Sequence, residues 1–203
     1  MYNRTQVKLQ AKQSLHANLG TAIGTTIVSS LILGLISAIG SLVIVGSIAS
    51  LVFVGVFGVG LSIVFLNIVR NCPVQFGDLF KGFNNFGTNC LAGILTSLFT
   101  ALWSLLFVIP GIVKTYSYAM TYYILADNPE MKPNDAITAS REMMDGHKFD
   151  LFVLHLSFFW WYLLGSITFG LAYIYVIPYV NAAQANFYET IKAEKINNST
   201  PNI

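Results

Sequence analysis

The chain has 203 residues, of which 55% are hydrophobic and only 10% are charged, and its formal net charge is +2. Soluble domains carry about 25% charged residues, so the composition is typical of a membrane protein and leaves little mass for a separate catalytic domain. The small net charge gives no reason to expect a nucleic-acid partner. We therefore expect an all-α, polytopic transmembrane helical bundle whose main partner is the lipid bilayer.

The first 19 residues are predicted to form an amphipathic helix on the membrane surface. Its apolar residues recur every fourth position among lysines and glutamines, at Val7, Ala11, Leu15 and Leu19. No Asp, Glu, Lys or Arg occurs between Lys12 and Arg70, and an uncharged tract of this length predicts a hairpin of two helices. A signal peptide would end after about 7–15 apolar residues, so we expect this segment to be retained.

The apolar segments predict six membrane spans, at 20–39, 46–68, 88–108, 112–127, 151–166 and 170–188. The fourth and fifth have only about 16 residues, slightly fewer than a helix normally needs, so four spans remain an alternative. The domain organisation is then an N-terminal interfacial helix at 1–19, one transmembrane domain at 20–190 and a flexible tail at 191–203.

The distribution of charge favours six spans with both termini in the cytoplasm. In that topology every basic residue except Lys114 lies on the cytoplasmic side, as does every Asp and Glu. The largest cytoplasmic element is a helix predicted at 132–148, with start signals at Pro133 and Asn134 and a C-terminal cap at Gly146.

The connection between the second and third spans carries phenylalanines at helical spacing, namely Phe76, Phe80, Phe83 and Phe86. We expect their face to dip into the membrane interface, on a helix weakened by three glycines. In the first span, Gly20 and Gly24 form a GxxxG motif. Packing within one bundle is the favoured interpretation of that motif, and a homodimer is the alternative.

Three stretches carry a family resemblance: IPGIVKTYSYAMTYYILADNP, DAITASREMMDGHKFDLFVLHLSFFWW and IPYVNAAQANFYETIK. With VKLQAK at 7–12, they resemble the domain of unknown function 975 family of bacterial multi-pass membrane proteins. The resemblance covers most of the chain and is strongest from about Val108 to Lys192. It implies a helical protein of the cytoplasmic membrane in mainly Gram-positive bacteria.

A more distant similarity rests on the order of an IPG turn, an exit at Asp127-Asn128-Pro129 and a helix with the pattern Ala-x-x-x-Ser-Arg. These features are similar to the membrane domain attached to some glycerophosphodiester phosphodiesterases. The similarity implies a relationship of fold, and a shared fold does not transmit chemistry.

Lys114 is the first candidate for a functional charge, because charged side chains within spans are costly and often functional. It lies near the outer end of its helix, so snorkelling to the headgroups is favoured, and a buried partner or a substrate contact is the alternative. Pro110 and Gly111 are expected to form a tight interfacial turn. A broken helix that lines a site is the other interpretation of this pair.

On the cytoplasmic helix, Ser140 and Arg141 are predicted to dock against the inner end of the bundle, where Arg141 is the expected partner of Asp127. A structural clasp is favoured over an anion site, since the neighbouring acids would repel phosphate. His147 is expected to be an ordinary hydrogen-bonded histidine. The remaining candidates are expected to shape or line the bundle, and they are Pro129, Gly146, Pro178, Asn181 and Gln184.

The sequence contains no nucleophile elbow, P-loop or dinucleotide fingerprint, and its cysteines and histidines lack metal-ligand spacing. We therefore expect no catalytic residue, metal or cofactor, and no enzyme activity. Two functions stay open. The favoured one is a scaffold or interaction module that engages another membrane or cytoplasmic protein. The alternative is a small transporter, exporter or immunity-type protein that handles a lipid-like or peptide solute through Lys114, Asn181 and Gln184.

Overall fold

A computed structural model describes residues 4–40, 44–106, 108–168 and 170–199, and this part of the chain is helical without strands. The elements in chain order are α1 (Arg4–Ala17), α2 (Leu19–Gly40), α3 (Ile44–Val69), the 3₁₀ helix η1 (Phe76–Phe83), α4 (Phe86–Leu106), α5 (Val108–Tyr118), α6 (Thr121–Asp127), α7 (Pro133–Met143), α8 (Lys148–Leu156), α9 (Phe159–Ile167) and α10 (Tyr173–Ser199). The predicted all-α class is confirmed.

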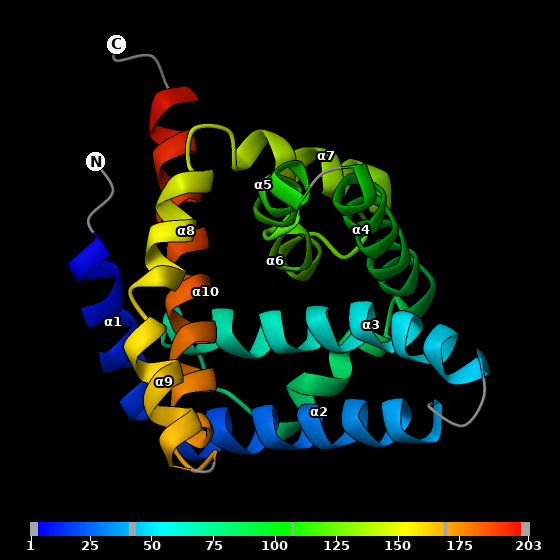
Figure 1. Cartoon of the computed structure of the whole chain (residues 1–203). Helices are drawn as coiled ribbons and strands as arrows, with labels where there is room; N and C mark the ends of the chain where they lie inside the picture. Colours follow the sequence, from blue (N-terminus) through cyan, green and yellow to red (C-terminus); the bar gives the residue numbers. More distant parts are fainter. Residues whose placement is uncertain (1–3, 41–43, 107, 169, 200–203) are drawn as a thin grey trace.

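The long helices run in clearly different directions, and α4, α5, α6 and α7 form a further group beside α3 (Figure 1). α2 and α3 lie side by side and antiparallel, while α1, α8, α9 and α10 run at a steep angle to them. α1 packs along α10 in the opposite direction, so the start of α1 and the end of α10 lie at the same end of the molecule. The sharp change of direction between α1 and α2 is 93°.

α3 and α10 form the centre of the packing. α3 contacts α2, η1, α4 and α6, and α10 contacts α1, α2 and α3. Side chains on several sides of α10 are therefore removed from solvent, including Ala182, Ala185 and Phe187. A helix that is buried on more than one side does not need a single apolar face, and the apolar residues of α10 accordingly occur on several of its sides.

Three helical segments are long and apolar enough to cross a membrane: Leu51–Val69, Phe86–Leu105 and Lys148–Ile167. A fourth is present if the bent pair Arg4–Ala17 and Leu19–Leu35 forms one span. Several helices can thus span a bilayer, while the six-span arrangement goes beyond what length and composition support.

Two of the predicted spans are interrupted. The segment at 112–127 is divided between α5 and α6 at Ala119 and Met120, and the segment at 151–166 is divided between α8 and α9 at Ser157 and Phe158. Neither break contains proline or glycine, the residues that normally mark an interruption in sequence. α10 begins three residues after the predicted start of the last span and continues well past its end.

The predicted interfacial turn at Pro110 and Gly111 is wrong, because both residues lie in the first turn of α5. Proline is tolerated there, since the first N–H groups of a helix have no intrahelical partner. Gly111 is buried against Ser104 of α4, and a Cβ at this glycine would collide with the Ser104 side chain. Its role is to let α5 approach α4 closely.

The closest glycine contacts lie on α3, while the predicted motif is only partly in contact. A Cβ at Gly60 would collide with the carbonyl oxygen of Leu79 in η1. In the motif on α2, a Cβ at Gly24 would lie 3.2 Å from the Phe76 ring, but one at Gly20 would meet no atom within 4 Å, and the same holds for Gly34. α3 therefore requires small residues where η1 packs against it. The predicted phenylalanine face does not point in one direction: the rings of Phe83 and Phe57 pack with their centres 5.6 Å apart, while Phe76, Phe80 and Phe86 are exposed.

Gly60→Ala is expected to destabilise the fold by about 1–3 kcal/mol, because the added methyl must displace η1 backbone. Gly34→Ala is the matched control, and it should be neutral or slightly stabilising because alanine favours helix. Thermal unfolding of both variants in detergent, followed by size-exclusion chromatography, measures the difference. Equal melting temperatures for Gly60→Ala and the wild type would refute the tight α3–η1 contact.

Candidate functional site

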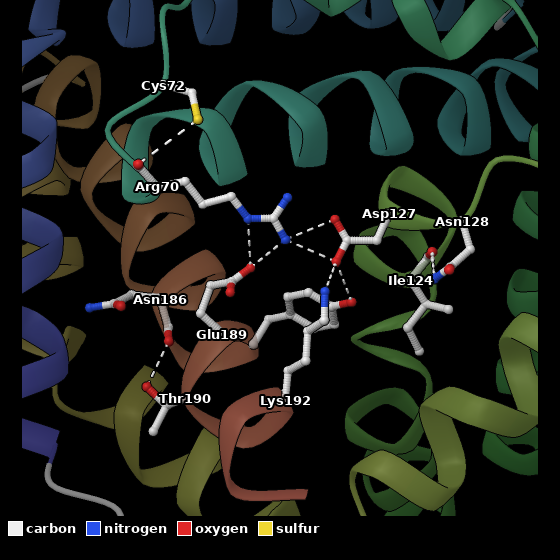
Figure 2. Close-up of polar contacts among 10 residues, drawn as sticks. Arg70, Cys72, Ile124, Asp127, Asn128, Asn186, Glu189, Thr190 and Lys192 are labelled. Carbon is white, nitrogen blue, oxygen red and sulfur yellow. Dashed lines mark hydrogen bonds and ion pairs between the residues drawn. The ribbon is translucent and has the colours of Figure 1, made fainter. Parts of the chain in front are cut away.

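Charged and polar side chains from three distant segments converge at one end of α3 (Figure 2). We call this group the polar cluster; its members are Arg70, Asp127, Tyr188, Glu189 and Lys192. Arg70 directly follows α3 and Asp127 is the last residue of α6. The other three lie on α10 at positions that share one side of a helix.

Asp127 is the centre of the polar cluster. One guanidinium nitrogen of Arg70, Nη2, lies 2.8 Å from Asp127 Oδ1 and 2.9 Å from Oδ2. Lys192 Nζ donates to Oδ2 at 2.5 Å, and the Tyr188 hydroxyl donates to the same oxygen at 3.0 Å. Arg70 also donates from Nε and Nη2 to Glu189 Oε1, at 3.0 and 2.6 Å. The contacts tie α6 and α10 to the end of α3.

The electrostatics of the polar cluster are balanced, since two cations face two carboxylates. The Asp127 side chain is only 9% exposed. Burial alone would raise the pKa of its carboxyl group, but the hydrogen bonds from Lys192 and Arg70, the charge of Arg70 and the Tyr188 hydroxyl outweigh it, so the pKa is lowered. Asp127 is therefore ionised at neutral pH and serves as an acceptor.

Side chains from other elements also satisfy both helix breaks. At the α5–α6 break, the buried Ser140 hydroxyl of α7 accepts the Met120 N–H at 3.2 Å and donates to the Ser117 carbonyl at 2.9 Å. At the α8–α9 break, Lys8 of α1 donates to the Ser157 carbonyl at 3.4 Å and to the Ser157 hydroxyl at 3.1 Å, and it lies 4.2 Å from the centre of the Phe158 ring. Backbone groups released by the breaks are thus occupied within the chain.

A polar cleft of about 530 Å³ opens beside the polar cluster, between α1, the end of α3 and α10. We call it the α1–α10 cleft, and its lining residues are Gln10, Gln13, Ser14, Val69, Arg70, Asn71, Asn186 and Glu189. Asn186 holds one wall in place, because its buried amide donates to the Val7 carbonyl at 2.9 Å and to Gln10 Oε1 at 3.2 Å.

The predicted pair of Arg141 and Asp127 is not formed. Asp127 is paired with Arg70 and Lys192, while Arg141 is exposed on α7. The prediction relied on a nearby helix, but α7 turns its small and apolar face toward the bundle, with Ser140 at its centre. The neighbouring serine, rather than the arginine, makes the docking contact.

The other predicted residues lie at separate places. Lys114 is half-buried, with its ammonium group 4.7 Å from the centre of the Trp103 ring. His147 lies 3.3 Å from Asp150, and Gln184 is hydrogen-bonded to His155. The remaining positions are the carbonyl of Pro129, which accepts from Asn85; Gly146, which has a φ of 83°; Pro178, inside α10; and Asn181, half-buried on α10.

Sequence reasoning missed the roles of Arg70, Glu189, Lys192 and Lys8. The available signal was the position of Arg70 and Asp127 at the ends of two apolar segments, combined with the helical spacing of Glu189 and Lys192. Arg70 and Lys192 lie 57 and 65 residues from Asp127 along the chain, and nothing in the local sequence shows that they meet this carboxylate. Among the residues with a described placement, no group of three potential metal ligands is assembled.

Asp127→Asn is expected to lower stability by about 1–3 kcal/mol, because it leaves Arg70 and Lys192 partly buried without a counter-charge. Glu130→Gln removes a nearby exposed acid and should have almost no effect. Thermal unfolding in detergent gives both values. A double-mutant cycle with Lys192→Met should show coupling, and additive effects would contradict the proposed contact.

Stability should also depend on pH in acid. Since the folded pKa of Asp127 lies below its ordinary value of 3.8, its contribution is fully present above that value and is lost as the pH falls through the folded pKa. Melting temperatures measured between pH 7 and about pH 3 should fall less steeply for Asp127→Asn than for the wild type. The residual slope is assigned to Asp78, whose lowered pKa reflects hydrogen bonds from Gln75 and Lys81 that outweigh its burial. Parallel curves for the two proteins would exclude Asp127 as the titrating group.

Comparison with known proteins places the chain in a family without assigning an activity. No curated protein and no solved structure matches it. The family model described as "Protein of unknown function (DUF975)" matches residues 1–120 and again residues 105–195, which together cover nearly the whole chain. The chain therefore belongs to the DUF975 family.

Proposed function

We propose that this protein is a non-enzymatic scaffold or interaction module of the bacterial cytoplasmic membrane, and that it engages a protein partner through α7. The observation that carries the proposal is that α7 is fixed to the bundle along one face and presents a charged face outward. A helix held in this way is preorganised for binding, because little conformational freedom is lost when a partner docks.

The inner face of α7 is buried through Ala136, Ile137 and Ser140. The Ser140 contacts at the α5–α6 break fix both its position along the bundle and its rotation. In the same turn, Lys195 of α10 donates to the Glu142 carbonyl at 2.6 Å, so α10 supports the last turn of α7. Polar contacts thus anchor the C-terminal end of the helix, and burial of Ala136 and Ile137 holds its N-terminal half.

The outer face of α7 and its flanks carries exposed polar side chains of both charges, at Asn134, Asp135, Thr138, Arg141, Glu142 and Asp145. Mixed charge of this kind favours a polar partner surface with complementary charges over a simple anion. The same face has no large apolar side chain, and it therefore differs from the surfaces that contact lipid.

The membrane location in this proposal is supported by large exposed apolar side chains on the candidate spans. α4 exposes Leu98, Leu102 and Leu105, and α9 exposes Phe159 and Trp160. Contiguous apolar surface of this extent is characteristic of contact with lipid or another protein. With α7 on the cytoplasmic side, α1 starts and α10 ends on that side as well, which agrees with the distribution of charge.

A second candidate, a small transporter or exporter, is favoured by the two interrupted helices, because discontinuous helices form the substrate sites of many transporters. In such sites the released backbone groups face the substrate. Here Ser140 and Lys8 occupy the released groups, and the Lys114 ammonium group lies over the Trp103 ring of α4. The scaffold therefore accounts for more of the contacts. A homodimer through the open face of α2 is compatible with it.

Photo-crosslinking in cells tests the proposed surface. A photoreactive residue at the exposed Thr138 should give a discrete protein adduct, and the same residue at the exposed Ala193 of α10 should not. Arg141→Glu should lower the adduct yield about tenfold, since a reversed charge opposes the partner, while the protein level stays normal. No adduct at Thr138, together with solute flux in reconstituted vesicles, would favour the transporter.

A further inference from the structure

The α1–α10 cleft is lined by the ion pair of Arg70 and Glu189, and this pair retains hydrogen-bonding atoms that could bind a ligand. Arg70 Nη2 donates to Asp127, and Arg70 Nε and Nη2 both donate to Glu189 Oε1. Figure 2 shows the third guanidinium nitrogen of Arg70 and the second carboxylate oxygen of Glu189 without a contact among the residues drawn. The cleft is thus lined by two side chains of opposite charge, one with an unused donor nitrogen and one with an unused acceptor oxygen among the residues drawn.

Both side chains reach solvent through this cleft. The Arg70 side chain is 33% exposed and that of Glu189 is 29% exposed, although each is fixed by its contacts in the polar cluster. Arg70 Nη2 lies 2.6 Å from Glu189 Oε1, which holds the two charged groups in one fixed orientation. Fixed charges of this kind bind a ligand without paying again for side-chain ordering.

The rest of the lining consists mainly of amide and hydroxyl groups. Gln10, Gln13 and Ser14 lie on the α1 wall, and Asn71 lies beside Arg70. Such groups donate and accept hydrogen bonds without adding charge. The volume of about 530 Å³ is within the usual range for small-molecule sites.

We propose that the α1–α10 cleft binds a small zwitterion that carries an ammonium group and a phosphate or carboxylate group. The acidic group of the ligand accepts a hydrogen bond from Arg70 Nη1, and its ammonium group donates to Glu189 Oε2. Gln10, Gln13 and Ser14 bind its polar body. This site extends beyond the proposed interaction through α7, and a bound ligand would join α1 to α10 and to the end of α3.

Thermal stabilisation of the purified full chain in detergent tests the chemistry. Phosphoethanolamine, which carries both groups, should raise the melting temperature in a saturable way. Ethanolamine and inorganic phosphate, which carry one group each, should bind at least about tenfold more weakly, since each loses one charge-assisted contact. Equal stabilisation by inorganic phosphate, or no stabilisation by phosphoethanolamine, would overturn the proposal.

Variants separate the site from the fold. Gln13→Trp fills the cleft and leaves every contact of the polar cluster in place, so it should abolish the stabilisation while the unliganded melting temperature is retained. Leu9→Trp adds the same ring at an exposed position of α1 outside the cleft and should bind normally. Glu189→Gln should weaken phosphoethanolamine at least about tenfold but leave phosphate unchanged. Normal binding by Gln13→Trp would place the ligand elsewhere and refute the site.

The source of the zwitterion is distinguished by reconstitution. In vesicles of phosphatidylglycerol alone, added phosphoethanolamine should bind the wild type. If phosphatidylethanolamine in the vesicles blocks that binding, a lipid headgroup occupies the cleft; if binding is unchanged, the ligand is a free solute. Both results support the site, whereas absence of phosphoethanolamine binding in the vesicles of phosphatidylglycerol alone overturns it. The α7 crosslinking experiment is independent of each of these outcomes.

Discussion

The buried carboxylate of Asp127 is the group on which the arrangement of the long helices depends. An ionised carboxylate removed from water is costly unless charged or hydrogen-bonding partners surround it. Asp127 has three such partners, from the end of α3 and from α10, which lie far from it in the chain. These contacts together restrict how α3, α6 and α10 can be placed relative to one another. The polar cluster therefore specifies the arrangement, even where its net contribution to stability is modest.

The same constraint acts at the two helix breaks. In a lipid environment, apolar contact distinguishes poorly between a helix and the lipid itself, so polar contacts and close packing determine which helices associate. Ser140 satisfies the α5–α6 break, and Lys8 satisfies the α8–α9 break. Each contact joins segments that the loops alone would not align. Together with Asp127 and the close approach of Gly60 to η1, they attach both terminal helices to the centre of the molecule.

The sequence was sufficient for features that depend on local periodicity. The helical spacing of the apolar residues of α1, the start of α7 at Pro133 and the long apolar helices follow from spacing and composition. The apolar stripe of α1 was expected to face the membrane surface, whereas in the structure it is buried and α1 packs on α10. The breaks at 119–120 and 157–158 were not predictable, because neither contains a residue that disfavours helix and both depend on distant side chains. The Arg141 prediction was wrong for the same reason: it chose a partner by proximity along the chain, while burial of Asp127 is compensated by residues that only the tertiary fold brings near.

A fold held together by internal polar contacts still leaves polar groups at its surface, and their positions separate structural from ligand-binding roles. Asp127 accepts on both oxygens and is nearly buried, so it has little capacity for a ligand. Glu189 accepts on one oxygen at the edge of a cleft, and Arg70 connects the two carboxylates. The contacts of Asp127 fix the helices, and this rigidity gives Arg70 and Glu189 a defined geometry at the cleft. A loosely held Arg70 would lose more entropy on binding than one oriented by Asp127. The structural role of Asp127 and the recognition role of the cleft are thus parts of one arrangement, because the first preorganises the second.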